Sequence, residues 1–225
     1  DNQRPKLTVK DALSNPRSDF NRVVLPPMSY AHEQDKVKNR WPAAEAFIRD
    51  RGLNEIFGPS DAPLGIVVQG GMYNGLIRAL QRLGLADIYG ATDVPIYVLN
   101  VTYPLISSEF LDFAQGKDHI LIVEEGQPEF IETQLGSFLY RAGSQVKLHG
   151  KGLFPMAGEY TGAVMLDAVE GFLKQAAPQM LPTQVRRFLT SLLALMFVAG
   201  CSHRPINQPL SAVKPSDGYY FHTHP

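Results

Sequence analysis

Three side chains that could do chemistry lie at the end of one apolar run, HILIVEEG (119–126). The carboxylates of Glu124 and Glu125 belong to the run, and the amide of Gln127 follows it. Ligands of open α/β sheets collect beyond the carboxyl ends of strands. Neighbouring strand residues point to opposite faces, so the two carboxylates form no close acid–base pair unless the chain bends. Two roles stay open: contact with a ligand, or capping of the next helix by one carboxylate while the other is solvated or meets a neighbouring domain. Gln127 has the same two roles.

A second group of candidate contact residues, Gly70, Gly71 and Asn74, lies in the segment QGGMYNG (69–75). The segment has neither G-x-G-x-x-G nor a GK[ST] ending, which excludes the dinucleotide fingerprint and the P-loop. The glycines are expected to allow a tight strand-to-helix turn and close helix packing. Attraction of an anion to a helix N-terminus here is the alternative.

Composition excludes several other kinds of chemistry. Cys201 is the only cysteine, so the chain cannot build an internal disulfide, a cysteine-based zinc site or a four-thiolate iron–sulfur cluster. His222 and His224 form an H-x-H in the tail without further ligands, and no metal site is expected. A formal net charge of −1 argues against nucleic acid as a partner. A core without cysteine fits a cytoplasmic protein.

The elements that position these residues alternate between strand and helix. The strands are expected to be almost continuously apolar, which indicates a sheet covered on both faces with parallel crossovers. The prediction is therefore an α/β fold: a three-layer, doubly wound, mainly parallel sheet of four or five strands. The expected strands are 64–71, 94–100, 119–126 and 145–150, and the expected helices are 72–84, 107–115, 128–143 and a last helix after 162 with Val164, Met165, Ala168, Val169, Phe172 and Leu173 on its buried face.

The chain is expected to divide into three parts. Residues 1–61 read as a lead-in with a short strand at 23–27, a polar loop containing His32 and a short helix at 41–51. Residues 62–179 hold the α/β domain, and residues 180–225 form an unrelated tail.

Five segments, in this order, resemble the middle of the large subunit of indolepyruvate ferredoxin oxidoreductase. The most specific parts are YPL, VEEGQPEFIE and LHGKGLFPMAGEYT occurring together. The resemblance covers residues 22–162 and implies a domain similar to the C-terminal domain of transketolase. The segments are RVVLPPMSYAHEQDKVKNRWPAAEAFI (22–48), GIVVQGGMYNGLIRALQRLGLADIYG (65–90), PIYVLNVTYPL (95–105), ILIVEEGQPEFIETQL (120–135) and LHGKGLFPMAGEYT (148–161).

The same resemblance implies what the chain lacks. Family members bind thiamine diphosphate and Mg²⁺ through a GDG motif, carry iron–sulfur clusters on clustered cysteines, and activate the thiamine with a glutamate of a preceding domain. This sequence has no GDG and no clustered cysteines. We therefore expect an internal piece or truncated product with no cofactor and no catalytic residue of its own. Its expected partners are other domains or subunits of a 2-oxoacid oxidoreductase, with ferredoxin a partner of the complete enzyme only.

The tail carries a different signal. Arg186 and Arg187, an apolar run at 188–200 and then Cys201 have the order of a bacterial lipoprotein signal. Residues 180–221 also resemble, more weakly, the beginning of bacterial patatin-like lipoproteins, although the G-x-S-x-G motif is absent. Three interpretations stay open: a fusion or frame join, a C-terminal hydrophobic helix with an accidental lipobox, and an anchor that associates the chain with a membrane through 188–201.

Two function classes result from the sequence. The first is a structural, inter-domain module of a thiamine-dependent 2-oxoacid:ferredoxin oxidoreductase. The second is a non-catalytic α/β binding or interaction module, for which association with a membrane through the C-terminal segment stays open.

Overall fold

The computed structural model describes residues 25–182. A five-stranded sheet forms its centre, with the strand order β1-β3-β2-β4-β5. The strands β2 (Leu64–Gln69), β3 (Ile96–Leu99), β4 (His119–Val123) and β5 (Lys147–His149) are parallel to their neighbours, whereas β1 (Glu55–Phe57) pairs with β3 in the antiparallel direction. The expected mainly parallel sheet is confirmed, and each parallel strand lies within its predicted range.

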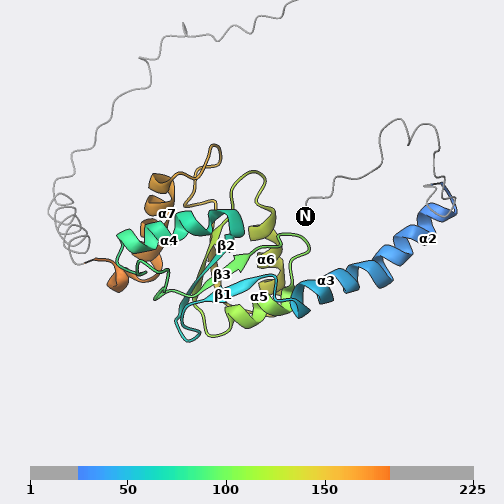
Figure 1. Ribbon diagram of the computed structural model, residues 1–225, viewed down its shortest axis with the longest axis horizontal. Helices are drawn as coiled ribbons and strands as arrows, with labels where there is room; N and C mark the ends of the chain where they lie inside the picture. The colour runs from blue at the N-terminus through green and yellow to red at the C-terminus, as the bar shows by residue number, and fades with distance from the viewer. Residues whose placement is uncertain (1–24, 183–225) are drawn as a thin grey trace, which may run out of the picture. The chain divides into compact units, whose positions relative to one another are not determined.

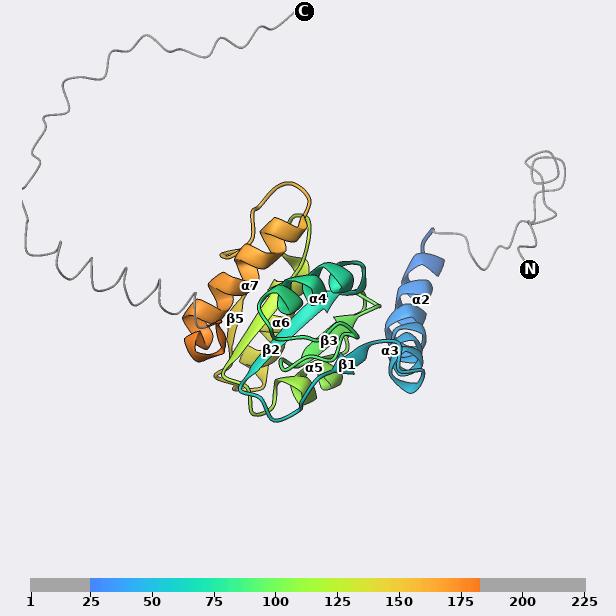
Figure 2. The same ribbon diagram turned by 60° about the vertical axis from the view of Figure 1, so that its left-hand side comes forward.

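Helices cover both faces of the sheet (Figures 1 and 2). Helix α4 (Tyr73–Arg82), which follows the short 3-10 turn η3 (Gly70–Met72), packs against α7 (Gly162–Ala176) on one face. Helices α5 (Ser107–Ala114) and α6 (Phe130–Arg141) pack together on the other. A short turn, η4 (Pro178–Met180), follows α7.

The core explains why the strands read as continuous apolar runs. On the face toward α5 and α6, the side chains of the central strands and of both helices form one buried cluster, which includes Val67, Tyr97, Phe110, Ile122 and Leu135. The alternate strand residues Ile66, Val68, Ile96 and Leu121 are also buried. Because successive strand residues point to opposite faces, burial of both sets requires a helical layer on each side.

The order of the parallel strands creates a topological switch point. From β2 the chain crosses to β3 through α4, and it then returns over β2 through α5 to reach β4. The chain therefore leaves β2 and β4, which are neighbours in the sheet, toward opposite faces. Such a reversal opens a crevice outside the carboxyl ends of the two strands.

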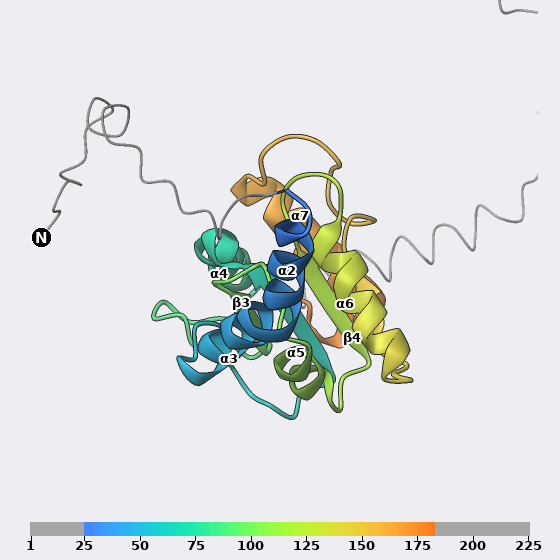
Figure 3. The same cartoon turned by 90° about the vertical axis from the view of Figure 1, so that its right-hand side faces the viewer.

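The segment before residue 62 is more structured than expected. It forms α2 (Met28–Asp35), a π-helical turn η2 (Lys36–Arg40) and α3 (Trp41–Asp50), drawn as one continuous helix in Figure 3, and it then supplies the edge strand β1. The domain limits at residues 61 and 179 stay predictions, but the sheet begins upstream of the first of them. Ile48 is buried and the Trp41 ring packs edge-on against Tyr103, with centroids 5.1 Å apart, so α3 is attached to the domain.

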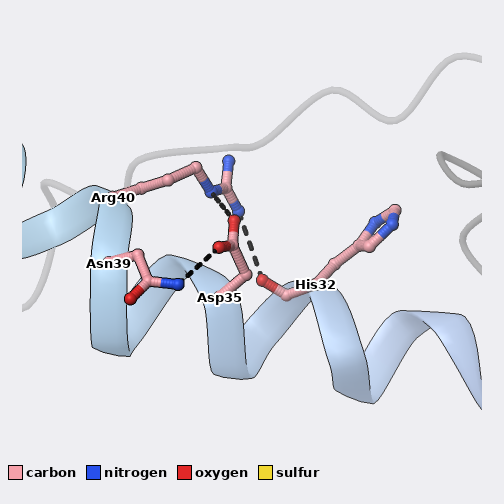
Figure 4. Close-up of polar contacts among 4 residues, drawn as sticks. All are labelled: His32, Asp35, Asn39 and Arg40. Atoms are coloured by element: carbon pink, nitrogen blue, oxygen red, sulfur yellow. Dashed lines mark hydrogen bonds and ion pairs between the residues drawn. The ribbon is translucent and has the colours of Figure 1, made fainter.

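Two local predictions were wrong. Of the strand expected at 23–27, residues 25–27 form a bend and a turn before α2. His32 lies in a helix and not in a polar loop, and its carbonyl oxygen accepts a hydrogen bond from Arg40 at 3.2 Å. Asp35 stabilises the same helix by accepting from Arg40 at 3.0 Å and from Asn39 at 2.9 Å (Figure 4). A helix that is polar on all sides lacks the apolar periodicity from which helices are predicted.

Candidate functional site

The fold brings the two predicted groups of residues to one edge of the sheet. Gly70, Gly71 and Asn74 follow β2, and Glu124 follows β4, which is paired with β2. The backbone N–H of Glu125 donates to Oε1 of Gln69 at 2.9 Å and so joins the ends of the two strands. The candidate site therefore lies at the switch point of the sheet.

Glu124 caps helix α6 from the preceding strand. Its side chain is 5% exposed, and its two oxygens accept hydrogen bonds from the N–H groups of Ile131 at 2.9 Å and Glu132 at 3.1 Å. The N–H of Phe130 donates to Pro128 O at 3.0 Å and that of Thr133 to Glu129 O at 3.1 Å. All four N–H groups of the first turn of α6 thus have partners, and the negative carboxylate lies where the helix dipole favours it.

Glu125 serves a different segment. It is exposed, and its carboxylate accepts a hydrogen bond from the N–H of Tyr160 at 2.7 Å, just before α7. The two neighbouring carboxylates therefore bind separate parts of the backbone. That they form no acid–base pair stays a prediction from the alternation of strand side chains.

Lys151, which the sequence did not single out, joins the β4–α6 loop to the segment before α7. Nζ of Lys151 donates to the carbonyl oxygens of Glu124 and Gly126, both at 2.6 Å, and to the hydroxyl of Tyr160 at 2.8 Å. The backbone N–H of Lys151 donates to Glu132 Oε2 at 2.9 Å. We call this set of contacts the Lys151 clamp. The signal in the sequence was the occurrence of GKG and EYT inside the one segment LHGKGLFPMAGEYT (148–161), but neither motif indicates the partner across the sheet edge.

The β2–α4 turn shows why one of its glycines is required. A Cβ atom at Gly70 would lie 2.6 Å from Oδ1 of Asn100, in the loop that follows β3. Asn100 is itself fixed by donating to Leu53 O and to Glu55 Oε2, both at 2.9 Å. A Cβ at Gly71 would meet nothing within 4 Å, and Asn74 is exposed on α4. Close approach of two loops therefore explains Gly70, and no such contact explains Gly71.

A groove of about 960 Å³ opens beside the β4–α6 loop. Gln127, exposed, lines it, and so do Glu125 and Gln69. Pro128 was expected in the first turn of the helix, but α6 begins at Phe130 and the Gln127–Pro128 bond is cis. The groove is also lined by Thr102, Tyr103, Leu105, Glu124, Gly126, Glu129, Ile131, Thr133, Gln134 and Ser137.

The residues that line this groove do not fit a bound diphosphate. Among the lining residues that the structure describes, none is lysine, arginine or histidine, and the N-terminus of α6 is already occupied by the Glu124 carboxylate. An anion would find neither a positive side chain nor a free N–H of that helix turn there. Within residues 25–182, no group of three or more histidine, cysteine, aspartate or glutamate side chains is placed to hold a metal ion.

The tail predictions lie elsewhere in the chain. Cys201 and the apolar run 188–200 fall outside the described residues, so their interpretations stay predictions. Of the helices between residues 25 and 182, none has both the length and the apolar character needed to cross a membrane.

Comparisons with known proteins agree with the family that the motifs indicate. Residues 54–177 match the family model described as the indolepyruvate oxidoreductase domain. The indolepyruvate oxidoreductase subunit IorA of Methanothermobacter thermautotrophicus is 29% identical over 158 residues, which are 69% of this chain and 24% of the relative. IorA of Pyrococcus abyssi is 33% identical over 126 residues, which are 56% of this chain and 18% of the relative.

Several solved structures are also similar, among them the following one. The 2-oxoglutarate:ferredoxin oxidoreductase from Magnetococcus marinus, with 2-oxoglutarate, coenzyme A and succinyl-CoA bound, matches with a TM-score of 0.43 and 16% identity, covering 65% of this chain and 24% of that one. The chain spans about a quarter or less of the length of the curated relatives. The family match covers more than half of the chain, and the chain therefore belongs to the indolepyruvate oxidoreductase domain family.

Proposed function

We propose that this chain supplies a structural, inter-domain module of a 2-oxoacid:ferredoxin oxidoreductase of the indolepyruvate type, and that it does not itself hold the coenzyme. In the complete enzyme, thiamine diphosphate, Mg²⁺ and the iron–sulfur clusters would be bound by other domains. The partners of this module would be those domains or subunits, and ferredoxin would meet only the assembled enzyme. The cytoplasmic location expected from the sequence is part of this proposal.

One observation carries the proposal: the polar groups at the switch point bind one another. Glu124 caps α6, Glu125 binds the Tyr160 backbone, and Lys151 donates to three oxygens. A general acid or base must reach the proton that it moves, and these groups already have partners within the domain. Their arrangement supports a structural role, in which these bonds fix the loops at the edge of the sheet where neighbouring domains would pack.

Calorimetry tests the first part of the proposal. Titration of the full chain with thiamine diphosphate and Mg²⁺ is expected to show no binding. None of the described residues that line the groove is cationic, and the Glu124 carboxylate already binds the N-terminus of α6. A micromolar dissociation constant would refute a module without a coenzyme site.

A graft tests the second part. Residues 54–177 would replace the matching segment of IorA from Methanothermobacter thermautotrophicus, with deletion of that segment as the control. The grafted subunit is expected to bind thiamine diphosphate and to support reduction of ferredoxin by the assembled enzyme, whereas the deletion is not. A grafted subunit that folds, by its circular dichroism, but behaves as the deletion does would contradict the inter-domain role.

A further inference from the structure

Two exposed aromatic side chains line the groove. Tyr103 is 69% exposed and Phe130 is 70% exposed, and both line it. They come from different loops, one after β3 and one at the start of α6. Tyr103 is supported from behind by Trp41, which packs edge-on against it. Large exposed aromatic side chains that gather at one concavity are typical of a surface that another molecule covers.

The charges of the groove have one sign. Glu125 and Glu129 line it, and no described lining residue is lysine, arginine or histidine. Glu129 makes no side-chain capping bond to α6. The N–H groups of the first turn of that helix are satisfied, so the groove offers carboxylates and aromatic faces and no free N–H group of that turn. Charge complementarity therefore favours a cationic occupant.

We propose that the groove receives a protein segment that carries an arginine or lysine beside an apolar residue, contributed by the rest of the oxidoreductase. The cation lies against the faces of Tyr103 and Phe130, close to the Glu129 carboxylate, and the apolar neighbour lies beside it in the groove. Aromatic rings attract a cation within about 6 Å of their centroids, and a carboxylate at the rim adds to that attraction. The inference rests on the proposed function, because the segment is supplied by the rest of the oxidoreductase.

The volume agrees with a segment and not with a single side chain. Pockets for drug-sized ligands measure roughly 300–1,000 Å³, and this groove, at about 960 Å³, is at the upper end of that range. A space of this size accommodates more than one side chain, as the proposed segment requires.

Trp41 provides the reporter for a binding assay. It is the only tryptophan of the chain and it contacts Tyr103. Titration of the full chain with a short acetylated peptide of alternating arginine and leucine is expected to change the Trp41 emission saturably. The same peptide with glutamate in place of arginine, and thiamine diphosphate with Mg²⁺, are expected to leave the emission unchanged.

Matched substitutions locate the binding. Phe130→Ala is expected to weaken the arginine peptide about three- to tenfold and Glu129→Gln about two- to fivefold. Tyr140→Ala, which removes an aromatic ring that is 86% exposed on the same helix outside the groove, and Asp167→Asn on α7 are expected to change it less than about twofold. Equal binding of the acidic peptide, or equal effects of the control substitutions, would overturn the proposal.

The outcomes also separate the two proposals. No saturable response to the arginine peptide, together with no binding of thiamine diphosphate, would refute only the cationic partner. Binding of thiamine diphosphate would refute the proposed function. Concentration-dependent dimerisation in light scattering that Phe130→Ala abolishes would assign the groove to a second copy of the chain and would also overturn the cationic segment.

Discussion

Replacement of Glu124 distinguishes a structural carboxylate from one held for a ligand. The side chain is 5% exposed and accepts two backbone hydrogen bonds, at 2.9 and 3.1 Å, from the first turn of α6. Glu124→Ala leaves the N–H groups of Ile131 and Glu132 without this acceptor. Each unsatisfied buried group costs about 1–3 kcal/mol, and relief of the buried charge offsets part of the sum, so the free energy of unfolding should fall by about 2–4 kcal/mol.

Glu124→Gln gives an intermediate value. The amide keeps one oxygen to accept a bond but turns an NH₂ group toward the other N–H, and it removes the charge that the helix dipole favours. A loss of about 1–2 kcal/mol is expected, roughly half of the alanine value.

Urea denaturation of the full chain, followed by far-ultraviolet circular dichroism, measures both losses. Small domains have stabilities of about 5–15 kcal/mol, so differences of this size shift the midpoint clearly. Glu129→Gln is the matched control, because Glu129 lies in the same loop and makes no side-chain bond to the helix. Its effect should stay within about 0.5 kcal/mol.

One result would refute this reasoning. If Glu124→Ala changed the free energy of unfolding by less than about 0.5 kcal/mol, or increased it, the carboxylate would not be acting as a cap. A stability gain on removal of a buried carboxylate is the behaviour of a functional site, and the ligand interpretation of Glu124 would then replace the structural one.

Three further predictions concern other parts of the domain. Nε2 of His149 lies 2.9 Å from Nδ1 of His119. The pKa of His149 is lowered from 6.5 by burial first and then by that neighbour, with Lys147 also lowering it, whereas a side-chain hydrogen bond with Gln175 and the charge of Glu132 oppose the shift. Its contribution to stability is therefore complete above the unfolded pKa and is lost as the pH falls below it, so the urea midpoint should drop between pH 7 and pH 5, and His149→Asn should flatten that drop. Lys151→Met removes the three side-chain bonds of the Lys151 clamp and should lower the free energy of unfolding by about 2 kcal/mol. Lys147→Met, at an exposed position, is the control and should have little effect. Equal losses for the two variants would show that the clamp bonds do not stabilise the fold. Truncation after Pro182, beyond the family match and beyond the buried Leu181, should leave the melting temperature unchanged in a thermal scan, and a marked fall would make the tail a part of the core.

Much of the fold was predictable from local sequence. The strands β2 and β4 are mostly apolar and are followed by glycines or carboxylates, and the apolar spacing of 72–84 predicted α4. These signals are local because hydrophobic periodicity and turn residues act over a few positions. The family followed from the order of several motifs, which also needs no structure, and the comparisons confirm it.

The failures have a common cause. Helix α2 has no buried residue, so no apolar stripe announced it. Strand β1 is only three residues long, and its pairing with β3 depends on where the chain returns after α3. Short or fully solvated elements are selected by tertiary contacts and by scattered polar pairs, which a periodicity does not encode.

The sequence alone thus determined that this protein is an α/β domain, which family it belongs to, and that Glu124 and Glu125 end a central strand. Only the tertiary structure decided what the two carboxylates do. Glu125 binds the backbone of a residue 35 positions away, and the carbonyl oxygen of Glu124 accepts from a lysine 27 positions away. Neither separation is marked by any local pattern, because hydrogen-bond partners at a sheet edge are chosen by the strand order and by the direction in which each loop leaves the sheet.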